Sequence, residues 1–195
     1  MKAKTLLTTA IIALSIISCR KDDDETPQPK IYPEENQFSA YLTATGFNQK
    51  TVNAINAGDY EFGLKFTPKV KGNIVAITFK IPDNAINVRV TIWDAGTKAV
   101  IKTITIPNAP ANTEIRQNID PFALTQGKSY LISYNGNDWY RHSKSDNSVA
   151  AYPIVVGNIS FDSYQWIGGS AQTFPASMSN DYYAGDLSFV FQQVD

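Results

Sequence analysis

Apolar and polar residues alternate with a period of two along most of the chain. The alternation is clearest over residues 60–66, 75–81 and 86–92, where aromatic or branched apolar side chains occupy every second position. A strand with one buried face shows this period, because successive side chains point to opposite faces of a sheet. The same pattern predicts further strands over residues 38–45, 100–106, 113–119, 129–135, 158–167 and 187–193. Beyond the N-terminal segment, no 3.6-residue period indicates a helix.

Turn-forming residues separate these segments at short intervals. Glycine and asparagine occur together in Lys71-Gly72-Asn73 and again in Asn135-Gly136-Asn137, a composition typical of tight turns. Short strands at this spacing predict an all-β fold, an antiparallel two-sheet β-sandwich of the fibronectin or jelly-roll kind with about 8–10 strands. We expect the domain to span residues 37–195. Roughly 160 residues can bury one core without disulfides or metal ions.

One local pattern indicates a Greek-key corner. In the sequence LTQGKSYLISY, Leu124 is followed by a glycine turn and by Tyr130, which opens an alternating strand. This resembles the tyrosine corner of β-sandwiches, in which the phenol forms a hydrogen bond with backbone a few residues upstream. The simpler alternative is a tyrosine that only fills the core.

The N-terminal segment has the features of a lipoprotein signal peptide. Lys2 and Lys4 precede a mostly apolar stretch over residues 6–17, which is long enough for a signal-peptide core but short of the roughly 20 residues that span a bilayer. The following Ile16-Ile17-Ser18-Cys19 resembles a lipobox. This resemblance implies cleavage after residue 18 and lipidation of Cys19, the only cysteine of the chain. The alternatives are an ordinary secretory signal with an incidental cysteine, or an N-terminal membrane anchor.

The segment after Cys19 predicts a tether. Residues 22–25 are four consecutive carboxylates, and they resemble the acidic sorting tag that sends lipoproteins to the external face of the outer membrane. A calcium site is the weaker interpretation, because the spacing of a calcium loop is missing. Three prolines and almost no apolar residues follow up to residue 36, which favours a disordered leash. We therefore expect an outer-membrane protein that faces the exterior and contacts the membrane through the lipid on Cys19.

Charge and composition exclude several functions. The chain has 17 Lys and Arg against 18 Asp and Glu, with no basic stripe, so a nucleic-acid partner is not expected. With one cysteine assigned to the lipid and the single His142, neither a disulfide nor a multi-histidine metal site is predicted. No nucleophile elbow, P-loop or zinc-protease motif occurs. We expect no cofactor; a structural calcium ion at the sandwich edge is compatible with carboxylates near turns, but no run of ligands predicts one.

Several segments, in order, resemble one protein family. They are YEFGLKFTPKVKGNIVAITFKI (residues 60–81), VRVTIWDAGTKAVIKTITI (88–106), ALTQGKSYLISYNG (123–136) and the closing aromatic DYYAGDLSFVF (181–191). Together they are similar to the domain of unknown function 4082 family over most of residues 59–195. Residues 139–179 depart from its pattern, because they are longer and more aromatic. The resemblance implies a β-sandwich of secreted or surface bacterial proteins; it implies no activity and no catalytic residues.

Aromatic residues in three places are the candidates for a ligand site. Trp93 occupies the same alternate positions of its strand as polar residues do, so it is expected on the polar face. Tyr164 and Trp166 occupy alternate positions opposite to those of the apolar Ile159, Phe161 and Ile167. A third group lies together in the predicted loop NGNDWYRH: Trp139, Tyr140, Arg141 and His142. Flat rings on an accessible face stack on sugars or anchor protein interfaces. The alternative at each place is a ring that packs beneath a loop.

These features together favour non-catalytic binding. The expected ligand is a carbohydrate, with a surface protein as the alternative partner of a structural or adhesive module. A small glycan-active enzyme is the second alternative, because scattered Asp and Glu residues are brought together only by the fold.

Overall fold

A computed structural model describes residues 30–195. The predicted signal peptide, the lipidated Cys19, the acidic tag and most of the predicted tether lie outside the described residues. Within the described part, no helix has the length and apolar character needed to cross a membrane.

Most of the regular structure in the described chain is strand. One short α-helix, α1 (Phe38–Thr45), and one 3₁₀ turn, η1 (Phe47–Gln49), lie near its start. The strands are β1 (Glu34–Asn36), β2 (Lys50–Ala54), β3 (Tyr60–Pro68), β4 (Gly72–Lys80), β5 (Ala85–Asp94), β6 (Val100–Ala109), β7 (Ile115–Leu124), β8 (Tyr130–Gly136), β9 (Trp139–Ser143), β10 (Ile154–Val156), β11 (Ile159–Gly168), β12 (Ser177–Ser179), β13 (Tyr182–Ala184) and β14 (Asp186–Gln193).

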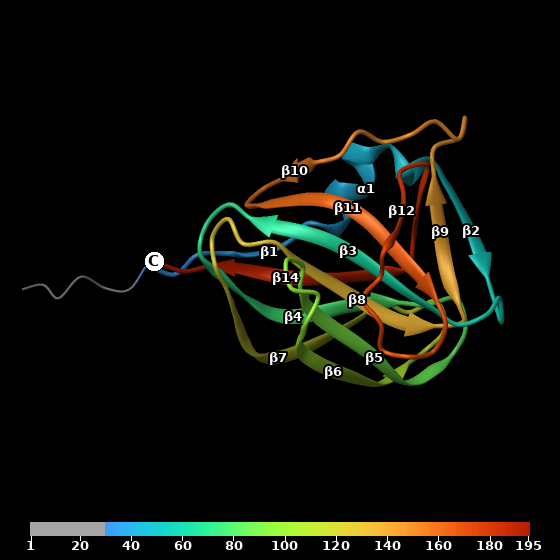
Figure 1. Cartoon of the computed structure of the whole chain (residues 1–195), viewed down its shortest axis with the longest axis horizontal. Coiled ribbons are helices and arrows are strands. Elements are labelled where there is room, and N and C mark those ends of the chain that lie inside the picture. Colours follow the sequence, from blue (N-terminus) through green and yellow to red (C-terminus); the bar gives the residue numbers. More distant parts are fainter. Residues whose placement is uncertain (1–29) are drawn as a thin grey trace, which may run out of the picture.

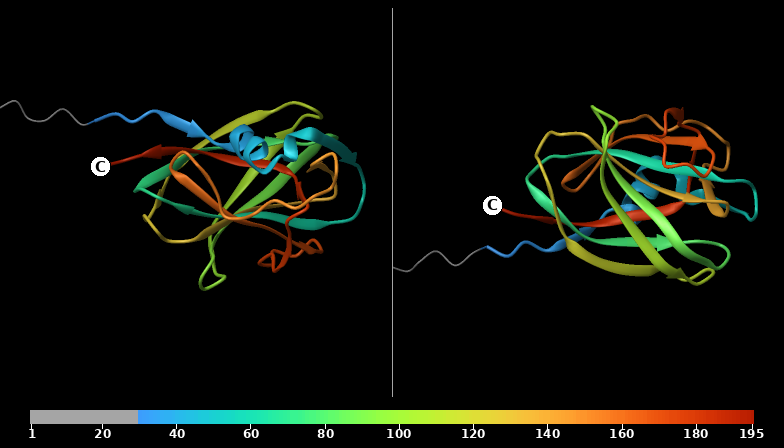
Figure 2. Two further views of the ribbon diagram at one scale, coloured as in Figure 1. Left: turned by 90° about the horizontal axis from the view of Figure 1, so that it is seen from above. Right: turned by 60° about the horizontal axis from the view of Figure 1, so that its bottom comes forward.

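These strands form three antiparallel sheets. The four-stranded sheet has the order β1-β14-β4-β7, and the seven-stranded sheet has the order β10-β11-β3-β8-β5-β6, with β12 paired to β11. The two sheets face each other as the layers of a sandwich (Figures 1 and 2). The third sheet, β13-β9-β2, stands at one end of the molecule. The predicted all-β sandwich is therefore confirmed.

Aromatic side chains fill the space between the two large sheets. Phe66 of β3 and Phe189 of β14 are fully or almost fully buried, with ring centroids 4.4 Å apart. Phe79 of β4 meets Tyr134 of β8 edge to face at 4.9 Å. Rings at these separations add about 0.5–1.5 kcal/mol per pair beyond the area they bury. The residues at the inward-facing alternate positions of the predicted strands thus form the core.

The eight strands predicted from residue 60 onward are confirmed, with ends that shift by a few residues. The number of strands is larger than the predicted 8–10, because six short strands of three to five residues, β1, β2, β9, β10, β12 and β13, were not predicted. A strand of this length presents too few positions for its alternation to be recognised. Glu34–Asn36 also falls inside the predicted tether, yet it pairs with β14, so the folded domain begins before residue 37.

The prediction of a strand over residues 38–45 is wrong, because this segment is helix α1. Phe, Tyr and Thr favour strands, but Phe38, Tyr41 and Thr45 recur at helical spacing and face inward. Tyr41 is fully buried and packs on Phe161 at 4.9 Å. Gly46, with φ of +76°, ends the helix and donates its N–H to the Thr43 carbonyl. Tertiary packing therefore overrides residue preference here.

The tyrosine corner is present in the form that the sequence predicts. The Tyr130 hydroxyl accepts a hydrogen bond from the backbone N–H of Thr125 at 3.0 Å, and the ring of Tyr130 is buried against Phe66. The phenol thus fixes the turn that leads from β7 into β8.

Candidate functional site

A cleft lined by aromatic side chains opens where the third sheet meets the seven-stranded sheet. Its volume is about 200 Å³. The residues that line it are Tyr60, Phe62, Trp139, Arg141, Trp166, Tyr182 and Ala184. Phe62 and Ala184 form the buried floor, whereas the two tryptophans and the two tyrosines are half-buried. We call this the aromatic cleft.

The aromatic cleft depends on the meeting of β3, β9 and β11. Tyr60 stands at the start of β3, and its ring lies edge to face against Trp139 at 5.3 Å and against Trp166 at 5.9 Å. Trp139, at the start of β9, also packs on the ring of Phe62 at 4.8 Å. The indole N–H of Trp166 donates to the Ser179 hydroxyl at 3.1 Å, which ties the ring to β12. Contacts between rings thus hold the walls of the cleft in place.

Arg141 is the only charged residue among those that line the aromatic cleft. It lies two residues after Trp139 on β9, so the two side chains share one face of the strand. Its guanidinium group lies 4.3 Å from the centre of the Tyr182 ring, a cation–π contact. The Arg141 side chain remains 51% exposed, and Asp181 approaches it only to 4.0 Å.

The prediction that residues 139–142 form a loop is wrong, because they belong to β9. Strand alternation sends Tyr140 and His142 to the buried face. The Tyr140 hydroxyl donates to the side-chain oxygen of Asn112 at 2.7 Å. The two ring nitrogens of His142 contact Asp186 and Thr51. The side chains of these two candidates are therefore buried and bonded to neighbouring segments instead of facing solvent.

The prediction that Tyr164 and Trp166 form a pair on the outer face of their strand is also wrong. A β-bulge between Phe161 and Ser163 inserts one residue into β11 and reverses the parity beyond it. Phe161 and Tyr164 consequently both point into the core, and Tyr164 is fully buried. Trp166 follows the same inward parity but lies near the end of the strand, where the sandwich opens into the aromatic cleft.

Trp93 lies on the outer face of the seven-stranded sheet, as its parity predicts, but a loop covers it. Residues 169–176, called the strap here, cross this face between β11 and β12, and Phe174 of the strap packs on Trp93 at 5.7 Å. Trp93 is only 2% exposed as a result. Gly63 permits close packing beneath the strap, because a Cβ there would lie 2.7 Å from the Leu131 side chain and 3.3 Å from Pro175 of the strap. Trp93 therefore does not belong to the candidate site.

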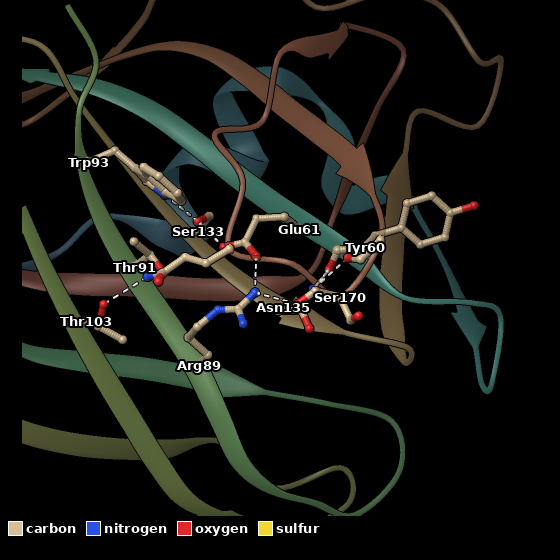
Figure 3. Close-up of polar contacts among 11 residues, drawn as sticks. Tyr60, Glu61, Arg89, Thr91, Trp93, Thr103, Ser133, Asn135 and Ser170 are labelled. Atoms are coloured by element: carbon tan, nitrogen blue, oxygen red, sulfur yellow. Dashed lines mark hydrogen bonds and ion pairs between the residues drawn. The ribbon is translucent and has the colours of Figure 1, made fainter. Parts of the chain in front are cut away.

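A buried polar network lies beneath the strap (Figure 3). Glu61 is fully buried; one carboxylate oxygen accepts from the Ser133 hydroxyl at 2.7 Å and the other from Arg89 at 2.9 Å. The Trp93 indole donates to the same Ser133 oxygen at 2.8 Å, and Arg89 also donates to the Ser170 carbonyl of the strap at 3.1 Å. Burial raises the pKa of the Glu61 carboxyl above its ordinary value, against the opposing effects of Ser133 and Arg89.

Asn135, the cross-strand partner of Glu61, supports the aromatic cleft from the same outer face of the sheet as the network. Asn135 donates one hydrogen bond to the Tyr60 carbonyl at 3.1 Å and one to the Gly169 carbonyl at 3.0 Å. It thereby joins the start of β3 to the end of β11, the two strand ends that carry cleft rings. Figure 3 shows the Tyr60 ring pointing away from the network. Strand alternation thus points the Tyr60 ring into the cleft and the neighbouring Glu61 carboxylate into the polar network on the other face of the sheet.

A larger hollow of about 470 Å³ lies at the bulge of β11, lined mainly by the short side chains of residues 150–151, 162–163 and 179–180. It has one ring, that of Tyr152, whose hydroxyl is paired with the hydroxyl of Tyr41. Over residues 30–195, no three His, Cys, Asp or Glu side chains converge as metal ligands would. The aromatic cleft is therefore the better-equipped candidate site.

The structure brings together three of the predicted site residues, Trp139, Arg141 and Trp166, and adds Tyr60 and Tyr182. Tyr60 and Tyr182 were not predicted as site residues, because a tyrosine among strand-forming residues resembles a core residue. No curated protein matches the chain. The family described as Domain of unknown function (DUF4082) matches residues 46–184, a range that contains every residue of the aromatic cleft.

Proposed function

The chain belongs to the domain of unknown function 4082 family, and we propose that it binds carbohydrate, without catalysis, in the aromatic cleft. The observation that carries the proposal is the convergence of Tyr60, Trp139 and Trp166, three half-buried rings from three different strands. Sugar rings present flat apolar faces to aromatic side chains, and their hydroxyl groups remain at the polar rim. Rings fixed by mutual packing lose little conformational freedom when they bind, which favours affinity.

The dimensions of the aromatic cleft favour a small ligand portion. Its volume of about 200 Å³ is below the roughly 300–1,000 Å³ of sites that enclose drug-sized molecules. A single sugar residue, such as the end of a glycan chain, is therefore the expected occupant. None of the described residues that line the cleft carries a carboxylate, imidazole or thiol, which favours binding over hydrolysis.

The placement of the aromatic cleft is consistent with a surface lipoprotein. β1 pairs with the end of β14, so the N-terminal segment enters beside the C-terminus. Figures 1 and 2 place this entry at the end of the molecule opposite the third sheet. We propose that Cys19 carries lipid and that the intervening residues form a leash. A domain held in this way presents the aromatic cleft away from the membrane.

Binding of the domain, residues 30–195, to a broad glycan array tests the proposal. The informative variant is Trp139→Ala combined with Trp166→Ala, which removes two walls of the aromatic cleft. Tyr32→Ala is the matched control, because Tyr32 is an aromatic residue at the opposite end whose hydroxyl donates to Asp195. We expect binding by the wild type and the control and loss of binding in the folded double variant. If the wild-type domain binds no glycan on the array, the carbohydrate proposal fails and a protein partner is the alternative to test.

A further inference from the structure

Arg141 separates two concave surfaces. On one side lies the aromatic cleft, and on the other side lies a smaller hollow of about 110 Å³. This hollow is lined by Lys50, Val52, Ser143 and Asn147 together with Arg141. A group bound to the rings of the cleft can therefore reach the guanidinium of Arg141 without leaving the site.

The guanidinium of Arg141 is oriented but has donors to spare. Tyr182 lies beneath it at 4.3 Å, and the contact with Asp181 is 4.0 Å long, which is beyond the 2.7–2.9 Å of a charge-assisted hydrogen bond. Within residues 30–195, the Arg141 side chain donates no hydrogen bond that meets ordinary distance limits. Five N–H donors in a planar fork match the geometry of a carboxylate.

A second cation stands on the same face. Val52 of β2 is the direct partner of Arg141 in the third sheet, and Lys50 lies two residues from Val52. Residues two apart on a strand point to the same side, so Lys50 and Arg141 are diagonal neighbours beside the hollow. Asp181 is the one acidic residue in contact with this pair among the described ion pairs. The rim is thus locally positive, although the chain as a whole has a formal net charge of −1.

We propose that the aromatic cleft selects an acidic sugar, one that carries a carboxylate or a sulfate group. This inference rests on the proposed carbohydrate function and names its ligand class. The apolar face of the sugar ring packs on Trp139 and Trp166. The anionic group accepts hydrogen bonds from Arg141, and Lys50 adds attraction at longer range. A neutral sugar of the same shape leaves the Arg141 donors to water.

Titration calorimetry with matched sugars tests the inference. The probes are glucuronate-containing oligosaccharides, their neutral glucose-containing counterparts, and sulfated forms of the latter. We expect the wild-type domain to bind the acidic probes about 10-fold or more tightly than the neutral ones, because a charge-assisted hydrogen bond is worth roughly 1.5–3 kcal/mol. Added salt should weaken the binding of acidic probes and leave the neutral ones nearly unchanged. Comparison of the affinities for the carboxylate and the sulfated probes shows which anionic group is preferred.

Variants of Arg141 separate its role from a general loss of structure. Arg141→Gln should abolish the preference for acidic probes while retaining the weaker binding of neutral ones. Arg141→Lys should retain part of the preference, because the charge remains but the planar fork is lost. Arg116→Gln is the control, since Arg116 is an exposed arginine of β7 that is paired with Glu34, and it should change nothing.

The outcomes distinguish this inference from the function on which it rests. Equal or tighter binding of neutral probes, or an acidic preference that survives in Arg141→Gln, overturns the inference and leaves carbohydrate binding in place. Failure of every probe and of the glycan array overturns both.

Discussion

Replacing Arg89 with methionine should make the stability of the domain depend strongly on pH. Arg89 is the cation that faces Glu61, and the Glu61 side chain has no exposed surface. Methionine keeps much of the packing of the Arg89 stem and removes the charge and both hydrogen bonds, to Glu61 and to Ser170. The buried carboxyl then has Ser133 as its remaining polar partner within the network.

The size of the effect follows from the two states open to Glu61. An ionised carboxylate that is buried without its partner costs about 3–5 kcal/mol. Protonation avoids this cost, but at pH 7 it takes about 3.4 kcal/mol to protonate a group with an ordinary pKa of 4.5. We therefore expect a loss of about 3 kcal/mol in the free energy of unfolding near pH 7. The loss should shrink by about 1.4 kcal/mol for each pH unit below that, down to about pH 5.

The direction in which stability changes with pH follows from the direction of the shift in the pKa of Glu61. The pKa of Glu61 is already raised in the folded state of the wild type, and removal of Arg89 raises it further. The folded state then holds a proton that the unfolded state releases, so stability falls as pH rises from the unfolded pKa toward the folded one.

Urea unfolding at several pH values between 5 and 8 measures the effect. Glu61→Gln combined with Arg89→Met is the matched control, because it removes the titrating carboxyl, and its free energy of unfolding should vary with pH no more than that of Glu61→Gln alone. A loss in Arg89→Met that is equal at pH 5 and pH 7.5, or one below about 1 kcal/mol at pH 7, would refute this view of Glu61.

Three further predictions concern the rest of the sandwich. Gly72→Ala should cost about 1–3 kcal/mol by urea unfolding, because its Cβ would overlap the Phe191 ring; an unchanged free energy of unfolding would contradict the close packing of β4 on β14. Tyr130→Phe should cost about 1 kcal/mol in the same assay, because the Thr125 N–H loses its acceptor; unchanged stability would mean that water replaces the phenol. Burial raises the pKa of Tyr152 to about 12, so its phenol should stay protonated through pH 10–11. The difference between the ultraviolet titrations of the wild type and Tyr152→Phe separates it from the other nine tyrosines, and a difference that appears near pH 10 would show that Tyr152 is accessible. Stability should fall above pH 10 for the same reason, because the unfolded phenol ionises first.

Most of the fold could be predicted from alternation because the long strands each bury one face. The helix over residues 38–45 could not, because its Phe, Tyr and Thr residues favour strands and only tertiary contacts with β11 decide the outcome. The bulge after Phe161 is equally hidden, because no glycine or proline marks it in the sequence. One inserted residue there reverses the parity of Tyr164 and Trp166 and with it the predicted exposure of both rings.

The aromatic cleft could be predicted in part. Trp139 and Arg141 were predicted from a segment expected to form a loop, and Trp166 from an outward parity on its strand. Both premises are wrong, because residues 139–143 form β9 and the bulge reverses the parity of Trp166, yet all three side chains line the cleft. Tyr60 and Tyr182 gave no such signal, since a tyrosine in an alternating strand normally fills the core. Trp93 was named on its outward parity, which is correct, but the strap that covers it lies some 80 residues later and pairs with no predicted strand.

Nuclear magnetic resonance of the three tryptophan indole N–H groups tests the carbohydrate site most directly. The domain, labelled with ¹⁵N, is titrated with neutral and acidic oligosaccharides, and Trp→Phe variants assign the three signals. Trp93 is an internal control, because it is buried beneath the strap and bonded to Ser133. We predict that a binding sugar shifts the signals of Trp139 and Trp166 and leaves that of Trp93 in place. Three unmoved signals with every sugar, or a shift confined to Trp93, would contradict a carbohydrate site in the aromatic cleft.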